Sequence, residues 1–287
     1  MLRRLLGVRP VLLDGAWGTR LQECGLPIGA CPDAWNLTDP GQVEALARAY
    51  VESGSAAILT NTFGANRYAL ERHGLADRAA DIAREGAGIS LRAAVGRACV
   101  VASIGPSGRM LAMGEVSEAE LAAAFYEQAR ALRDAGVEAA VVETMSDVEE
   151  AAIAVQAAVR AGLDVVATMV FYTGRDGDRT MMGQTPEEAA TALRKAGASV
   201  IGANCGKGAE QIVPICRRLR AATDLPLWVK LNAGLPELVE GRAVYRTGPE
   251  EWAGQMLSLI AAGADFVGGC CGTTPAHIAA LAKALRN

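Results

Sequence analysis

Cysteines are the residues of this sequence whose type and spacing most clearly allow chemistry. They stand at positions 24, 31, 99, 205, 216, 270 and 271, while histidine occurs only at 73 and 277. Cys205 and the adjacent pair Cys270 and Cys271 follow runs of small and apolar residues, so three thiols come from the ends of two expected strands. Zinc favours thiolate sulfur and commonly takes four tetrahedral ligands. The pattern therefore predicts a zinc site made by these three thiolates, with a fourth position open.

The sequence GGCCGTTP bears on whether two adjacent cysteines can share a metal. Successive strand residues point to opposite faces, so both thiols reach one ion only where the backbone leaves strand geometry. Gly268, Gly269 and Gly272 are expected to supply that freedom. Two other interpretations stay open, namely burial of free thiols and a vicinal disulfide between Cys270 and Cys271. Burial alone, or a loop position, is the interpretation for the remaining Cys24, Cys31, Cys99 and Cys216.

Other polar side chains also stand at the ends of expected strands. Asp14, Asn61 with Thr62, Glu143 and Asn232 take such positions. In a barrel of parallel strands the carboxyl ends converge on one mouth, where enzymes of this architecture build their active sites. Asp14 could instead cap a helix, and Asn232 could simply tolerate a turn. Glu143 follows several apolar residues and is harder to explain without a partner, because burying an unpaired carboxylate is costly.

The elements that must position these residues alternate along the whole chain. Short β-branched runs are separated by amphipathic stretches, several of which begin with Ser, Thr or Pro and end at a glycine. The eight strands are expected at 11–15, 55–63, 98–106, 137–144, 163–171, 198–205, 226–232 and 264–271. Eight such units predict an α/β fold, a (β/α)₈ barrel with the zinc site at the carboxyl ends of its strands. A doubly wound sheet is disfavoured, because Asp14-Gly15-Ala16-Trp17-Gly18 lacks the spacing of a phosphate loop.

Length and composition favour one domain over residues 1–287. No linker or low-complexity tract divides the 287 residues, and the longest irregular stretches are expected at 25–40, 172–184 and 235–249. A net charge of −4 with interleaved Arg and Glu predicts no nucleic-acid or acidic-membrane partner. No apolar run is long enough to cross a bilayer, and the basic start is interrupted by Pro10 and Asp14, so no secretory signal is expected. The cytoplasm is the predicted location, where thiols stay reduced.

Several blocks of the sequence resemble the homocysteine S-methyltransferase family. The most specific are GANCGKG around Cys205 and GGCCGTTPAHI around Cys270 and Cys271, which resemble the zinc signatures of that family. Further similar blocks are LDGAWGTRLQ (13–22), TNTFGANRYAL (60–70), SIGPSG (103–108), VETMSD (142–147), MGQTPEEA (182–189) and LNAGLP (231–236). LDGAWGTRLQ, TNTFGANRY and NAGLP are most similar to the methionine synthase branch.

The resemblance implies a function and a set of roles. It implies that zinc on Cys205, Cys270 and Cys271 activates the thiol of homocysteine, whose sulfur takes a methyl group to give methionine. It further implies that Asp14 and Glu143 hold the substrate ammonium. The carboxylate is then expected at the backbone amides of Gly15 and Ala16 or of the loop with Asn61, Thr62 and Phe63. The implied methyl donor is either methylcobalamin on a partner protein or domain, or S-methylmethionine or another onium compound.

Three points stay open at this stage. Asn232 is a candidate fourth zinc ligand in the absence of substrate. The fold could also serve a corrinoid-linked methyltransferase that acts on another small methylated substrate, or a zinc-binding module without turnover. His277 and His73 are interpreted as residues near helix ends rather than as ligands.

Overall fold

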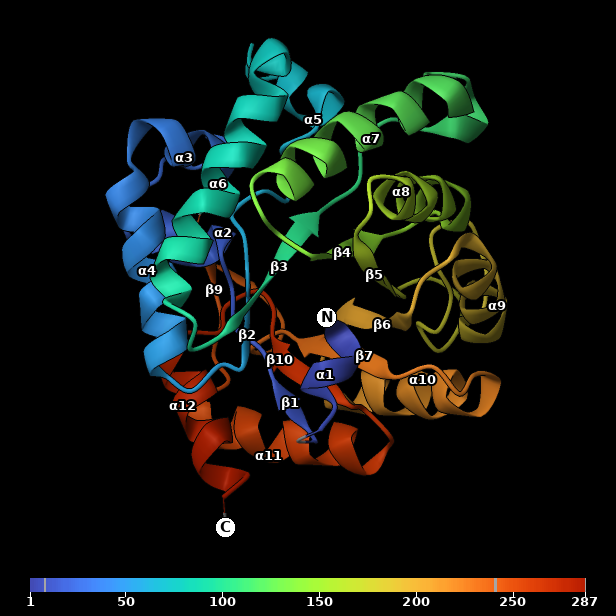
Figure 1. The fold of residues 1–287 in the computed structure, drawn as a ribbon. Helices are drawn as coiled ribbons and strands as arrows, with labels where there is room; N and C mark the ends of the chain where they lie inside the picture. Colours follow the sequence, from blue (N-terminus) through green and yellow to red (C-terminus); the bar gives the residue numbers. More distant parts are fainter. Residues whose placement is uncertain (8, 240–241, 287) are drawn as a thin grey trace.

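Eight parallel strands form a ring at the centre of the computed structural model, which describes residues 1–7, 9–239 and 242–286 (Figure 1). The strands are β1 (Val11–Leu12), β2 (Ala57–Leu59), β3 (Cys99–Ile104), β4 (Ala139–Met145), β5 (Asp164–Met169), β6 (Val200–Cys205), β7 (Leu227–Leu231) and β10 (Phe266–Gly269). They pair in the order β1-β10-β7-β6-β5-β4-β3-β2, and a parallel bridge between Leu13 and Ala57 joins the two ends of this row. The predicted barrel is confirmed.

Helices surround the ring on its outer side (Figure 1). The larger ones are α4 (Pro40–Glu52), α6 (Ala79–Ala94), α7 (Glu118–Asp134), α8 (Val148–Arg160), α9 (Pro186–Ala196), α10 (Ala209–Ala222), α11 (Pro249–Ala261) and α12 (Pro275–Ala284). Shorter ones are α1 (Leu2–Leu5), α2 (Gly18–Glu23), α3 (Trp35–Thr38) and α5 (Arg67–Glu71), with 3₁₀ turns at Pro32–Ala34, Ala76–Arg78 and Leu111–Met113. In the described part of the chain, no helix combines the length and apolar character needed to cross a bilayer.

The local signals read from the sequence explain where these helices begin and end. Ser117, Thr185 and Thr274 each form a capping box, which satisfies free amides at the start of α7, α9 and α12. At the other end, the glycines expected to close helices have φ between 87° and 108°, a left-handed conformation that favours glycine. They are Gly54, Gly136, Gly162, Gly197 and Gly263.

The barrel has two ends that differ in their packing. We call the amino ends of the strands, together with α1, the floor, and the carboxyl ends with their loops the mouth. Side chains that point into the barrel form a compact apolar cluster that includes Leu13, Val141, Trp228 and Phe266, and Leu2 of α1 is part of it. The rings of Trp228 and Phe266 lie 5.3 Å apart, centroid to centroid. The barrel interior below the mouth is therefore filled, and within the barrel a ligand has space only at the mouth.

Two of the stretches expected to be irregular contain regular structure. The segment 235–249 holds an antiparallel pair of strands, β8 (Glu237–Val239) and β9 (Arg242–Val244). Residues 240–241 between them lie outside the described residues. Both strands are short and β8 is exposed, so they lack the buried alternation that marks a strand in sequence. The segment 25–40 holds a 3₁₀ turn and α3. The expectation of irregular loops was wrong for both.

Candidate metal centre

The three cysteines predicted to hold a metal lie together at the mouth. The sulfur atoms of Cys205, Cys270 and Cys271 are all within 4.8 Å of one another, and the Cys205 and Cys270 sulfurs are 3.1 Å apart. All three are free thiols of intermediate exposure. The alternative of a vicinal disulfide is therefore wrong for this structure, and the two sequence-distant segments meet as predicted.

Strained backbone aims Cys205 at the other two thiols. Cys205 has φ 66° and Thr144, at the end of β4, has φ 62°, both in the left-handed region that non-glycine residues rarely occupy. Asn204 holds this arrangement: its Oδ1 accepts from the Thr144 amide (2.9 Å) and the Thr168 hydroxyl (2.6 Å). Its Nδ2 donates to the Thr144 hydroxyl (2.8 Å) and lies 3.4 Å from the Cys205 sulfur. Asn204 thus links the ends of three neighbouring strands directly behind the cysteines.

The glycines around Cys270 and Cys271 are required mainly for space rather than for freedom. A Cβ on Gly268 would lie 2.6 Å from the Leu13 side chain, and one on Gly269 would lie 2.1 Å from the Thr273 hydroxyl. Gly272 alone of the three has positive φ, 78°. The physical role expected for Gly268 and Gly269 is therefore corrected: they let β1 and the Thr273 side chain approach the turn closely.

Ionisation of the three thiols is strongly interdependent. Hydrogen bonds from Cys205 and Cys270 lower the pKa of Cys271 to about 3. Donation to Cys270 and Cys271 raises the pKa of Cys205 well above its usual range. A hydrogen bond from Cys205 favours the Cys270 thiolate, but donation to Cys271 and burial raise the pKa of Cys270 to about 12. One thiolate is thus stabilised, and ionisation of the others requires a cation to offset the accumulated negative charge.

The donor set fits zinc. Zinc–sulfur bonds of about 2.3 Å place the sulfurs of a tetrahedral site about 3.8 Å apart, within the range seen here. Asn232 is the candidate fourth donor, because it follows β7, the strand between β6 and β10, which carry or precede the cysteines. The buried Oδ1 of Asn232 has no hydrogen-bond partner among the described residues, while its Nδ2 donates to the Gly206 carbonyl (2.9 Å). An orphaned buried acceptor is costly unless a ligand satisfies it.

A charged group that the sequence interpretation missed lies below the thiols. Lys230, in β7, is buried, and its Nζ donates to Asp14 Oδ1 at 2.6 Å. Burial alone would lower the pKa of Lys230, but Asp14 and Glu143 raise it, so the ammonium form is favoured. Burial raises the pKa of Glu143 to about 7, although Lys230 and a 2.5 Å hydrogen bond from the Ser103 hydroxyl oppose this. Two carboxyl groups and one ammonium therefore share the site.

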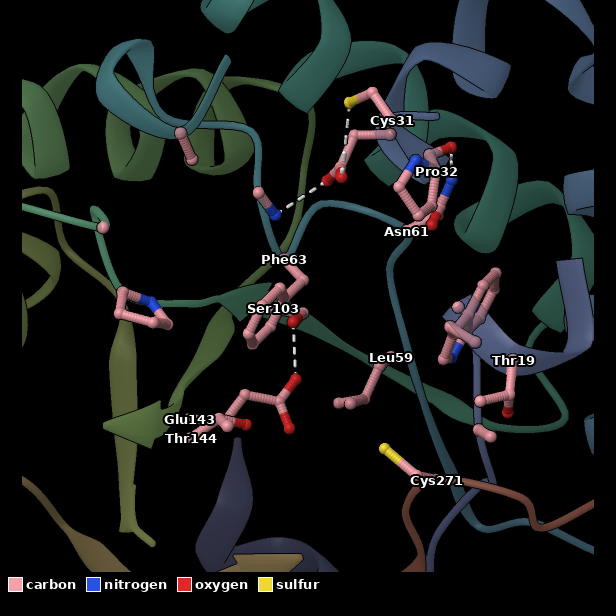
Figure 2. Close-up of a pocket in the computed structure, with 18 of the residues that line it drawn as sticks. Thr19, Cys31, Pro32, Leu59, Asn61, Phe63, Ser103, Glu143, Thr144 and Cys271 are labelled. Carbon is pink, nitrogen blue, oxygen red and sulfur yellow. Dashed lines mark hydrogen bonds between the residues drawn. The ribbon is translucent and has the colours of Figure 1, made fainter. Parts of the chain in front are cut away.

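A cavity of about 1190 Å³ opens above these groups. The three cysteines, Lys230 and Glu143 line it, as do Gly15, Ala16, Asn61 and Phe63 from the predicted substrate set. Figure 2 shows the Cys271 sulfur and the Glu143 carboxylate pointing into the same space. Asp14, Thr62 and Asn232 lie behind the lining: Thr62 donates to the Ser103 carbonyl (2.7 Å), and Asp14 is fully buried. Eleven predicted residues therefore gather around one mouth, eight in the lining of the cavity and three behind it.

Several predicted residues have protein partners that limit what they can offer a ligand. The Asn61 amide donates to the Pro32 carbonyl (2.8 Å) and to Asn36 Oδ1 (2.9 Å), so its side chain braces the loop before α3. The Ala16 amide donates to the Thr273 hydroxyl (3.0 Å). Asp14 does not cap a helix, because α2 has Trp17 as its N-cap.

His277 and Tyr245 also contribute at the mouth. His277 caps α12 as expected, and its Nε2 lies 2.9 Å from the Thr247 carbonyl. Tyr245 follows β9 and lies beside Cys271, where its hydroxyl helps to lower the pKa of the Cys271 thiol. Burial together with the cysteine charges raises the pKa of Tyr245. No sequence signal marks Tyr245, since it lies in the stretch expected to be irregular.

Comparisons with known proteins agree with this geometry. A model of the family described as homocysteine S-methyltransferase matches residues 11–285. Methionine synthase of Mycobacterium tuberculosis (strain ATCC 25618 / H37Rv) is 34% identical over 300 residues, which cover 99% of this chain and 25% of that protein. Methionine synthase of Mycobacterium leprae (strain TN) is 32% identical over 296 residues, 98% of this chain and 24% of that protein. The chain thus spans about a quarter of the length of these relatives.

Solved structures share the fold. The homocysteine methyltransferase MmuM from Escherichia coli in its metallated form superposes with a TM-score of 0.82 at 24% identity, over 99% of both chains. Its oxidised form superposes with a TM-score of 0.80 at 24% identity, again over 99% of both chains. At this level of identity the likeness concerns the barrel architecture.

Proposed function

Because the chain belongs to the homocysteine S-methyltransferase family, we propose that it binds homocysteine and transfers a methyl group to the homocysteine sulfur, giving methionine. The observation that carries the proposal is the thiol cluster, which stands beside Glu143 and Lys230 at the base of one cavity. Homocysteine combines a thiol with an ammonium and a carboxylate, and this site offers partners for all three. We take residues 1–287 as the homocysteine-binding barrel.

Cys205, Cys270 and Cys271 would hold a zinc ion, with Asn232 Oδ1 as the fourth donor before substrate arrives. When bound, zinc supplies the positive charge that keeps thiols ionised at neutral pH. The chain itself contributes orientation, because Asn204 and the strained backbone at Cys205 direct the sulfurs. Tyr245 favours the thiolate form of Cys271. The thiols must stay reduced for this role, so the proposal keeps the cytoplasm as the compartment.

The reaction itself is a displacement at a methyl carbon. The substrate sulfur, after loss of its proton, forms a bond to the methyl carbon while the bond from that carbon to the donor breaks, and the electron pair leaves with the donor. Orientation of the sulfur in line with the methyl carbon lowers the barrier, because the two reactants are then held in the reactive arrangement. Burial of Glu143 and Lys230 strengthens their interaction with a zwitterionic substrate, because the surrounding dielectric is low.

For the methyl donor we favour a methylcobalamin-carrying protein or domain over a small onium compound such as S-methylmethionine. Of the thirteen large apolar side chains exposed in the described residues, ten stand on loops of the mouth, including Leu238 (84% exposed) and Met113 (71%). We take these exposed side chains as a contact surface for another protein, because apolar groups that gather into a patch mark such surfaces. A small donor would need only the cavity.

Two other functions use the same fold. A corrinoid-linked enzyme acting on another methylated substrate would not need an ammonium partner at Glu143, and a zinc module without turnover would not need an open cavity. The buried charges at the base of the cavity favour the methyltransferase acting on homocysteine.

Incubation of the zinc-loaded protein with homocysteine and each donor in turn tests the proposal. We expect methionine with a methylcobalamin protein. Formation of methionine from S-methylmethionine alone would mean that the methyl donor is this onium compound rather than a methylcobalamin protein. Absence of homocysteine binding, measured by calorimetry, would contradict the proposed substrate.

A further inference from the structure

Lys230 is a buried ammonium group whose bonding capacity is only partly used. It lies one residue before the carboxyl end of β7 with its side chain 3% exposed, and it lines the cavity. An ammonium group has three N–H donors, yet within the described residues its one hydrogen bond goes to Asp14 Oδ1. Two donors therefore remain at the edge of the cavity, and buried donors without partners are costly.

Asp14, by contrast, is fully engaged by the protein. Its Oδ1 accepts from Lys230, and its Oδ2 accepts from the Leu59 amide (2.7 Å) and the Trp17 indole (2.8 Å). The residue is 0% exposed and does not line the cavity. It is therefore poorly placed for direct contact with a substrate ammonium, the role that the family resemblance implied.

Glu143 retains the free carboxylate oxygen that Asp14 lacks. Its Oε1 accepts from the Ser103 hydroxyl at 2.5 Å, and no partner is recorded for Oε2 among the described residues. The carboxylate points into the cavity (Figure 2). One anionic acceptor and one cationic donor group thus face the same space, next to the thiol cluster.

The backbone amides expected for a substrate carboxylate are partly occupied. Of the expected amides, the Ala16 amide donates to the Thr273 hydroxyl. On either side of the expected loop, the Thr60 amide donates to the Val101 carbonyl (3.2 Å) and the Gly64 amide to Asp33 Oδ1 (2.9 Å). Neutral amides that remain can add hydrogen bonds, but none of them carries the charge that offsets burial of a carboxylate.

We propose that Lys230 binds the carboxylate of the amino-acid substrate, that Glu143 binds its ammonium, and that Asp14 is a positioning residue which holds the Lys230 ammonium in place. The inference rests on the proposed function, since it assigns the two charged ends of homocysteine. It makes the site selective for a thiol that is also an α-amino acid, because each end of the zwitterion meets a buried group of opposite charge.

Three thiol ligands separate these contacts: homocysteine, 3-amino-1-propanethiol, which lacks the carboxylate, and 4-mercaptobutanoate, which lacks the ammonium. Their dissociation constants are measured by calorimetry on the zinc-loaded protein. The wild type is expected to bind homocysteine at least about 10-fold more tightly than either analogue, the scale of a lost charged hydrogen bond.

In Lys230→Met the preference for homocysteine over 3-amino-1-propanethiol should fall to near 1, while 3-amino-1-propanethiol itself binds as in the wild type. In Glu143→Gln the preference over 4-mercaptobutanoate should fall instead. If Lys230→Met does not fold because Asp14 is left unpaired, the double variant Asp14→Asn/Lys230→Met takes its place with the same expectation.

If the Lys230 variant binds homocysteine and 3-amino-1-propanethiol more weakly by the same factor, the inference is overturned. Lys230 would then offset the negative charge of the thiolates instead of binding the substrate carboxylate. An unchanged preference would overturn it as well. Failure of all three thiols to bind the wild type is a different result, which would contradict the proposed function itself.

Discussion

The floor and the mouth of the barrel are built from the same eight strands, yet they treat polar groups in opposite ways. At the floor, Asp164 accepts hydrogen bonds from the Leu2 amide (3.0 Å), the chain's terminal amine (3.2 Å) and the Ser199 hydroxyl. Asp265 contacts Arg9 (2.8 Å) and accepts from the Leu227 amide (2.9 Å). Every oxygen of these two carboxylates has a partner, and apolar side chains fill the space beside them.

At the mouth the same strands carry strain and unmet hydrogen bonds. Cys205 and Thr144 have left-handed backbone conformations. Asn232 Oδ1 has no hydrogen-bond partner among the described residues, and Lys230 uses one of its three N–H donors there. Such features persist only where the surrounding structure enforces them, and they mark the positions where a ligand completes the site. Stability is therefore concentrated at the floor and function at the mouth, which makes variants of the two ends separable.

The largest expected effect is on metal binding at the mouth. Cys271→Ser should weaken zinc binding by more than about 100-fold, beyond the loss typical of an outer hydrogen-bond partner of a ligand, and should abolish methionine formation. Zinc titration with a competing chelator measures this. Cys24→Ser is the matched control, because Cys24 is exposed and far from the cluster in sequence. Equal zinc affinity in the Cys271 and Cys24 variants would contradict the assignment of the metal site to the three cysteines at the mouth.

At the floor, Phe266→Ala should lower the free energy of unfolding by about 3–5 kcal/mol, since it leaves a cavity against Trp228. Urea denaturation measures the loss, and the folded fraction should keep its zinc affinity. Phe266→Leu, which keeps most of the volume, should cost less than about 1.5 kcal/mol. A zinc defect without lost stability would show that the two ends are not separable.

Asn204→Ala should reduce zinc affinity by about 10–100-fold, because Asn204 orients the strand end that carries Cys205. Thr168→Val removes only one of its hydrogen bonds and should have a smaller effect. If both substitutions leave zinc affinity unchanged, the left-handed conformation of Cys205 is held by other contacts.

The pH dependence of stability should have opposite signs at the two ends. Asp33 lines the outer part of the cavity, and its burial raises its pKa from 3.8 to about 6. Between these two pH values the folded protein keeps a proton on Asp33 that the unfolded chain has lost. The contribution of Asp33 to the free energy of unfolding is therefore fully present below pH 3.8 and is lost as the pH rises to about 6. Asp33→Asn keeps an acceptor for Gly64 and should remove a fall of about 3 kcal/mol, at about 1.4 kcal/mol per pKa unit. Denaturation curves between pH 4 and 8 that match the wild type would contradict this.

Asp164 at the floor should show the smaller, reverse effect. Burial disfavours its ionised form, but the bonds from Ser199, Leu2 and the terminal amine outweigh this and lower its pKa. Its contribution is therefore present above the unfolded pKa and is lost as the pH falls through the lower, folded value. In Asp164→Asn the acid loss of stability should shrink by less than about 1 kcal/mol, because the group is partly exposed. An Asp164→Asn protein that gains stability at neutral pH would contradict the assignment.

The sequence was sufficient for the architecture and for the meeting of the three cysteines, while their role as metal ligands stays a prediction. Strand and helix periodicity, capping residues and terminal glycines are local signals, so all eight strands of the barrel could be predicted. Cys270 and Cys271 within a glycine-rich turn, and Cys205 at another strand end, could be brought together once the barrel was assumed.

The charged part of the site could not be predicted, because it depends on contacts between distant residues. Lys230 and Asp14 are 216 residues apart, and nothing local reveals that they pair. A lysine in the middle of the apolar run PLWVKLN is unusual for a strand buried on both faces, and this was the signal available. The antiparallel strands β8 and β9 escaped prediction because they are short and lie outside the barrel.

X-ray absorption at the zinc edge, recorded with and without homocysteine, tests the central claim most directly. We predict one zinc per chain with three sulfur ligands and one oxygen ligand, changing to four sulfur ligands when homocysteine is added. Absence of zinc, or a ligand shell that homocysteine leaves unchanged, would contradict the claim that the three cysteines at the mouth form the centre that activates the substrate thiol.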